Sequence, residues 1–145
     1  MKQLLSRSQY TKILAAAAGS EVGQLSQLLQ EKYQVSIVRP AQKTLTMMQF
    51  REPVKASLFY LGEVLCSECI VEVAGFKGAA VMIGDDFAKV TAAAIIDAAY
   101  NGKLPECEAL DKAIRELEKE QLAARGKLNA GLRCSKVDFN TMGEQ

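Results

Sequence analysis

The sequence contains no histidine. Histidine is the usual general base of enzymes and the commonest metal ligand, so histidine-dependent serine or cysteine triads and histidine-rich metal sites are excluded. Any chemistry of this chain would have to use carboxylates, lysines, thiols or backbone groups. The four cysteines do not sit in a short secreted scaffold, so a disulfide framework is not expected either.

Charge imbalance and long apolar runs are also lacking. Eighteen basic and 17 acidic residues give a net charge of +1, which provides no strong field to attract nucleic acid or an acidic membrane. No stretch approaches the roughly 20 apolar residues that a transmembrane helix needs, and the N-terminus does not look like a secretion signal. We therefore expect a cytoplasmic protein without nucleic-acid or membrane partners.

The 145 residues are enough for one domain, residues 1–145, organised around its central stretch. Val64–Val73 alternates in polarity with a period of two, which places Cys69, Val71 and Val73 on the buried face of a strand. The glycines of residues 74–78 then permit a tight reversal into a second apolar strand, Ala79–Ile83. A β-hairpin is the simplest interpretation.

A very apolar helix follows this hairpin. Asp85 or Asp86 can cap its start, and Asn101-Gly102 ends it. Ala92–Ala99 is apolar except for Asp97, which is too apolar for a helix with one face in water. We therefore predict that this helix is covered on both sides.

The flanking segments complete an α+β fold. Residues 1–34 have the helical periodicity of an N-terminal helical hairpin. Further short extended runs are Val35–Val38, Leu45–Phe50 and Leu58–Leu61. Residues 35–102 are therefore predicted to hold an antiparallel sheet of about four to five strands, packed by helices, together with the central helix.

Residues 103–145 are predicted to form a long C-terminal helix and a docking tail. Residues at intervals of three and four along the helix form a seam, in which the polar Gln121 fills one position and the others are apolar: Leu110, Ile114, Leu117, Ala124 and Leu128. A helix unbroken to Arg133 would be about 43 Å long, more than the roughly 30 Å diameter of a small domain. Either it breaks near Gly126 or Gly131, or part of it lies on something else.

Cys66 and Cys69 form the first motif that suggests chemistry. A redox dithiol or half of a zinc site would use this spacing. On a strand, however, residues three apart point to opposite faces, so we predict no metal or cofactor site in this chain. A small thiol or metal protein stays open as an alternative, as does a standalone homo-oligomeric binding module that associates through the seam.

Several blocks together resemble one known family. They are Phe59–Leu65, Glu68-Cys69 leading into Val71–Val73, Gly78–Asp86, Ile95–Ala98 and the closing Val137–Met142. In this order they look like the PhnG family, the G subunits of the carbon–phosphorus lyase core complex of bacterial phosphonate metabolism. The resemblance spans nearly the whole chain.

The resemblance implies a cytoplasmic subunit assembled with PhnH, PhnI and PhnJ into a core with two copies of each, with PhnL associated. The complex transfers the ribose triphosphate moiety of ATP to methylphosphonate, giving α-D-ribose 1-methylphosphonate 5-triphosphate. The iron–sulfur cluster and S-adenosylmethionine belong to PhnJ, and the transfer is attributed to PhnI. This chain is thus expected to be a noncatalytic subunit of a transferase complex that binds no cofactor itself.

Only the closing block is carried over from the family residue by residue, as a partner interface. It consists of Val137, Asp138, Phe139, Thr141 and Met142. We expect Phe139 and Met142 to insert into an apolar groove, either within this fold or on PhnI. Leu110, Ile114 and Leu117 of the seam are the other predicted interface residues.

Overall fold

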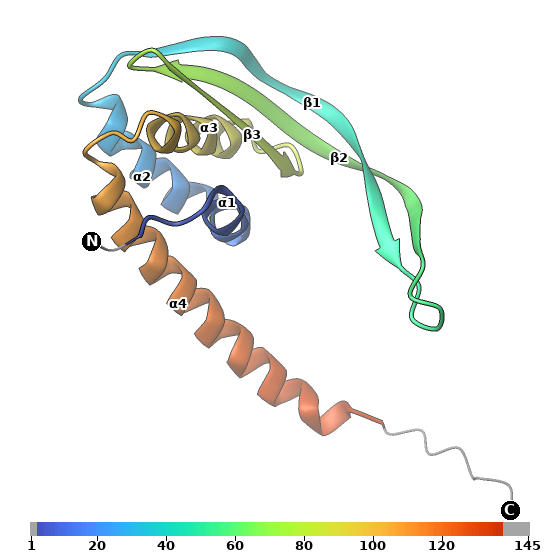
Figure 1. Cartoon of the computed structure of the whole chain (residues 1–145). Helices are drawn as coiled ribbons and strands as arrows, with labels where there is room; N and C mark the ends of the chain where they lie inside the picture. Colours follow the sequence, from blue (N-terminus) through green and yellow to red (C-terminus); the bar gives the residue numbers. More distant parts are fainter. Residues whose placement is uncertain (1–2, 138–145) are drawn as a thin grey trace, which may run out of the picture.

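The structure is a computed structural model and describes residues 3–137. Its elements are α1 (Arg7–Ala16), α2 (Gly19–Gln30), β1 (Val35–Arg51), β2 (Leu58–Val73), β3 (Phe76–Ile83), α3 (Phe87–Asn101), α4 (Cys107–Leu132) and the short 3₁₀-helix η1 (Arg133–Ser135). The three strands form one antiparallel sheet in the order β1-β2-β3. The predicted α+β class is confirmed, with two N-terminal helices and a long C-terminal helix (Figure 1).

Helix α3 lies in the middle of the layers. It packs against β2 and β3 on one side and against α2 and α1 on the other (Figure 1). Every residue of Ala92–Ala99 is buried, which confirms the prediction that this helix is covered on both sides. Its ends are also as predicted, because the Asp86 carboxylate accepts a hydrogen bond of 3.0 Å from Lys89 N and Gly102 caps the C-terminus.

The sheet has three long strands, so the predicted four to five short strands are wrong. Pro40 lies within β1 and does not end it, because β1 is an edge strand and can spare a backbone donor. Register shifts flank this proline between Ile37 and Gln42. The two predicted strands Leu58–Leu61 and Val64–Val73 also join into one strand, β2, which continues through Gly62. A further register shift in β1, between Met48 and Gln49, lies opposite this glycine.

The predicted β2–β3 hairpin is confirmed, although β3 begins at Phe76 and not at Ala79, so the turn is shorter than predicted. Ala74 and Gly75 both have positive φ, 52° and 82°, the backbone conformation of a type I′ turn, which matches the twist of paired strands. Cys69, Val71 and Val73 are buried against α3, as their alternation indicates.

A buried carboxylate joins three elements. Asp97 of α3 is 1% exposed. It accepts hydrogen bonds from Tyr10 Oη at 2.6 Å, Arg7 Nη2 at 2.8 Å, Ala79 N at 2.9 Å and Asn101 Nδ2 at 3.3 Å. Four donors compensate the cost of burying the charge. The sequence marks Asp97 only as a polar interruption of an apolar helix.

The rings of Tyr10 and Tyr100 stack with centroids 4.2 Å apart. Burial, followed by the hydrogen bond to Asp97, raises the pKa of Tyr10, and burial together with the charge of Asp111 raises the pKa of Tyr100. In the unfolded chain both would ionise near pH 10.

We therefore expect stability to fall as the pH rises above about 10. The unfolded chain then loses tyrosine protons that the folded chain retains, which favours unfolding. Urea titrations at increasing pH measure this loss. Because no hydrogen bond reaches Tyr100 Oη from the described residues, Tyr100→Phe should reduce the alkaline loss without disturbing the fold at neutral pH. The same pH dependence in Tyr100→Phe and the unaltered chain would contradict the expectation.

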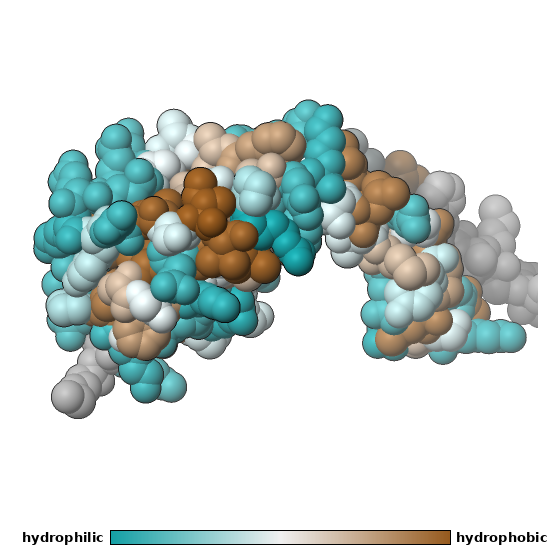
Figure 2. All heavy atoms as spheres, turned by 90° about the horizontal axis from the view of Figure 1, so that it is seen from above, coloured by the Kyte–Doolittle hydropathy of each residue, from teal (hydrophilic) through white to brown (hydrophobic). Residues whose placement is uncertain are grey.

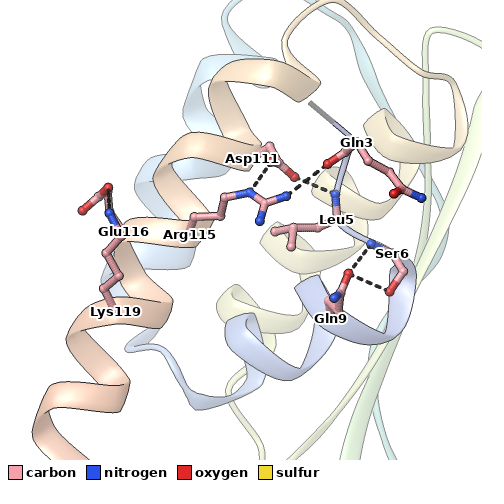
Figure 3. Close-up of polar contacts among 8 residues, drawn as sticks. All are labelled: Gln3, Leu5, Ser6, Gln9, Asp111, Arg115, Glu116 and Lys119. Carbon is pink, nitrogen blue, oxygen red and sulfur yellow. Dashed lines mark hydrogen bonds and ion pairs between the residues drawn. The ribbon is translucent and has the colours of Figure 1, made fainter. Parts of the chain in front are cut away.

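The N-terminal segment ties the first half of α4 to the body (Figure 3). Asp111 accepts hydrogen bonds of 2.7 Å from Leu5 N and from Arg115 Nε, and Arg115 Nη2 donates to Gln3 O at 3.1 Å. At the start of α4, Glu106 accepts from Lys32 and Tyr33, each at 3.0 Å. The hydrogen bond from Lys32 lowers the pKa of Glu106.

Helix α4 is continuous through both Gly126 and Gly131. Its 26 residues span about 39 Å. The body covers only the first part, since every described residue after Gln121 is exposed. Of the two alternatives that the sequence left open, a break near Gly126 or Gly131 is absent, and the second half of α4 projects away from the body (Figure 1).

Candidate protein interaction site

The sheet extends beyond the helices as a two-stranded ribbon. Strand β3 ends at Ile83, opposite Cys66, so β2 before Cys66 pairs only with β1. We call residues 45–65, which comprise this ribbon and its connecting turn, the β-arm. In Figure 1 it curves away from the body beyond the end of β3.

The β-arm exposes many large apolar side chains. They are Leu45, Met47, Phe50, Val54, Leu58, Phe59, Tyr60, Leu61 and Leu65, between 41% and 86% exposed. Figure 2 shows hydrophobic side chains along the projecting part as well as on the body. Large apolar side chains that gather exposed on one projecting element mark a binding surface on many proteins.

One face of the β-arm continues the core face of the sheet. Leu45 pairs with Leu65, so their side chains share a face. Alternation along β2 places Leu65 on the same face as the buried Cys69 and Val71, yet Leu65 is 41% exposed and Leu45 is 61% exposed. The apolar face of the sheet thus extends beyond the helices that cover it on the body. Another protein can cover the part of this face that lies on the β-arm.

The projecting half of α4 also leaves its seam uncovered. Leu110 and Ile114 are fully buried within the chain's own core, so their predicted place in a partner interface is wrong. Leu117 packs at the edge of that core, and its interface role stays a prediction. The free part of the seam lies further along, where Leu128 is 62% exposed and Leu132 is 56% exposed.

The two arms leave the body toward the same side. Figure 1 shows the β-arm and the second half of α4 diverging from it, and Figure 2 shows a hollow between the body and the projecting part. The sequence does not predict this arrangement. The one sequence signal for it is the unbroken apolar run Leu58–Leu61. A strand with one face in water would alternate apolar and polar residues, so this run indicates apolar side chains on both faces.

The outer edge of β3 is closed in its first half. Gly84 N donates to Leu65 O, which fixes the register of β3 on β2. The backbone N–H and C=O groups of even-numbered residues of β3 therefore face β2, and those of odd-numbered residues face outward. Two of the outward groups, Lys77 O and Ala79 N, form hydrogen bonds with side chains of α3. Asn101 Nδ2 donates to Lys77 O at 2.8 Å, and Ala79 N donates to Asp97.

The second half of that edge is open. Among residues 3–137, no hydrogen bond reaches the outward backbone groups of Val81 or Ile83, and these residues are 57% and 77% exposed. A cavity of about 310 Å³ lies beside it, between α1 and β3, lined partly by Thr11, Leu14 and Met82. An open strand edge can pair with an extended segment of another protein.

The closing block lies almost wholly outside the described residues. Val137 is described and is 66% exposed. Asp138, Phe139, Thr141 and Met142 fall beyond it, so the interface role of this block stays a prediction.

The cysteines do not converge. Cys66 and Cys69 are both buried and free, and the regular β2–β3 register places their side chains on opposite faces. Cys69 Sγ donates to Arg39 O at 3.4 Å. Within the part of the chain that the structure describes, no three His, Cys, Asp or Glu side chains form a group that could hold a metal ion.

An open depression of about 800 Å³ lies between α2 and α3. Its lining includes Ser26, Gln27 and Thr91, and its described residues include no carboxylate, lysine or thiol. It offers hydrogen-bonding groups but no acid or base.

Comparison with known proteins supplies the identity. Among the described residues, no helix combines the length and apolar character required to span a bilayer. A search of curated proteins finds no match to the chain. A scan against known families matches residues 5–143 to the family described as phosphonate metabolism protein PhnG. The chain therefore belongs to the PhnG family, whose role lies in phosphonate metabolism within the carbon–phosphorus lyase complex.

Proposed function

We propose that this chain is a noncatalytic subunit that supports transfer of the ribose triphosphate moiety of ATP to methylphosphonate. Membership of the PhnG family supports the setting. The observation that carries the proposal is the uncovered apolar surface of the β-arm and of the second half of α4. A chain with such surfaces acts by holding other proteins in place.

The energetics favour a permanent partner. Fully burying one large apolar side chain contributes about 1.5–3 kcal/mol. The β-arm alone exposes nine such side chains, so covering even half of them would stabilise an assembly strongly. Ordering and association costs offset part of this gain.

The proposed partners are PhnI, PhnH and PhnJ, with PhnL associated and two copies of each core subunit. In this proposal the complex takes ATP and methylphosphonate, and PhnJ carries the iron–sulfur cluster and S-adenosylmethionine. The present chain contributes binding surface and works in the cytoplasm.

The variant Leu45→Ser/Leu65→Ser tests the proposal. Both side chains are exposed, so we expect the isolated chain to keep its stability within about 0.5 kcal/mol. Affinity for the co-expressed partner subunits should fall on the order of 100-fold, because truncating hot-spot residues at the centre of an interface costs about 2 kcal/mol or more. Co-purification stoichiometry and titration of the purified partners measure the effect.

Leu28→Ser is the matched control. Leu28 is 46% exposed on α2, away from both arms, so this variant should assemble normally. Unchanged affinity of the double variant would contradict the proposal, as would an unaltered chain that forms no complex with these subunits.

A further inference from the structure

The second half of α4 carries charge of one sign. The cations are Arg125 and Lys127 within α4 and Arg133 and Lys136 just after it, and residues 122–137 contain no carboxylate. The first half, in contrast, contains the acidic residues Glu108, Asp111, Glu116, Glu118 and Glu120 among three basic ones. We call residues 122–136 the α4 arm.

The two halves also differ in pairing. In the first half, Asp111 pairs with Arg115 and Glu116 with Lys119, each at 2.7 Å. No ion pair within residues 3–137 involves Arg125, Lys127 or Arg133. Asp138 and Glu144 of the remaining tail lie outside the described residues.

The helix dipole explains only part of this pattern. Cations are favourable near a helix C-terminus, but the effect falls off within the last turn. Arg133 is close enough to benefit. Arg125 precedes the last residue of α4, Leu132, by about two turns. The helix dipole therefore does not account for the positive charge at Arg125.

The cations border an apolar stripe. Ala124, Leu128 and Leu132 follow one another at four-residue intervals and lie on the helix face that, nearer the body, carries the seam. At 3.6 residues per turn, Arg125 lies beside this stripe on one side and Lys127 on the other. The α4 arm thus presents an apolar centre with a positive rim.

We infer that the α4 arm docks against an α-helix of a partner subunit, whose own apolar seam is bordered by aspartate and glutamate. The inference rests on the proposed function and adds the chemistry of the partner. Apolar residues at four-residue intervals form a ridge that suits helix-to-helix packing. The positive rim selects an acidic one and accelerates encounter with it.

A second copy of this chain fits the surface less well. Its α4 arm carries the same positive rim and would repel. Its acidic half would attract, but there Leu110 and Ile114 are already buried in that copy's own core. Nucleic acid would use the cations alone and leave Leu128 and Leu132 without a contact.

Charge reversal tests the inference. Arg125→Glu/Lys127→Glu should slow association of the full chain with the partner subunits on the order of tenfold in about 0.1 M salt. The difference should shrink in about 1 M salt, where the Debye length falls to roughly 3 Å. Lys112→Glu/Lys119→Glu makes the same charge change on the body half of α4 and should associate like the unaltered chain. Surface plasmon resonance measures both rates.

A photo-crosslinking residue in place of Leu132 identifies the partner element in the assembled complex. We expect crosslinks to an acidic, heptad-like peptide of another subunit, and reversal of its acidic residues to lysine should restore association of the Arg125→Glu/Lys127→Glu variant. Crosslinks to a second copy would overturn the inference. So would binding of a duplex oligonucleotide that the reversal abolishes while assembly persists.

Two failures are distinguishable. If the reversed variant associates like the unaltered chain at both salt concentrations, the inference is wrong and the proposed function stands. If even the unaltered chain forms no complex, the proposed function is wrong and this inference falls with it.

Discussion

Replacing Asp97 with alanine should lower the free energy of unfolding by about 2–5 kcal/mol. The change leaves the buried Tyr10 hydroxyl and Ala79 N–H without an acceptor, and each such loss costs about 1–3 kcal/mol. The ion pair itself adds little, because the Arg7 side chain is 61% exposed. Urea denaturation measures the difference.

Arg7→Ala is the control for that variant. It removes one exposed partner but leaves the carboxylate with its buried donors, so a loss of at most about 1 kcal/mol is expected. If the two substitutions cost the same, the exposed ion pair and not the buried hydrogen bonds would be the main contribution of Asp97.

Gly78→Ala should be almost as damaging, with a loss of about 3 kcal/mol. A Cβ at this position would overlap backbone atoms of Ala94 and Ala98, where β3 lies directly on α3. A helix backbone cannot rotate aside as a side chain can, so the strand and the helix must separate. Overpacking of a core typically costs 1–3 kcal/mol, and contact with backbone places this case at the upper end.

Gly62→Ala is the matched control on the same sheet. A Cβ at Gly62 meets nothing within 4 Å. This variant should unfold at the same urea concentration as the unaltered chain or slightly above it. Equal destabilisation by the two alanines would mean that the close packing of β3 on α3 does not set the cost at Gly78.

The central hairpin and α3 were predictable because their signals are local. The turn conformation depends on Ala74 and Gly75, and the ends of α3 depend on Asp86 and Gly102, each within a few residues of the element it shapes. The length of β1 was not predictable, because Pro40 is tolerated only where no neighbouring strand needs its missing N–H.

The interaction site was predicted only in outline. The seam of the last helix is visible in the sequence, but its spacing is the same at Ile114, which is buried, and at Leu128, which is exposed. Where the body ends beneath α4 depends on the segments packed against it, including the N-terminal residues that bond Asp111 and Arg115. The β-arm likewise exists because β3 stops at Ile83 while β1 and β2 continue.

By itself, the sequence determined the helices and strands that have a clear hydrophobic period or a capping residue, such as the central hairpin and α3. It also contains the ordered blocks that indicate the family. The tertiary structure alone decided which apolar residues lie inside and which remain outside. Asp97 draws its partners from residues as distant as Arg7, 90 positions away, and the free half of α4 is defined by where the core ends. Burial depends on contacts between distant segments, and periodicity along the chain reports only which face a residue occupies.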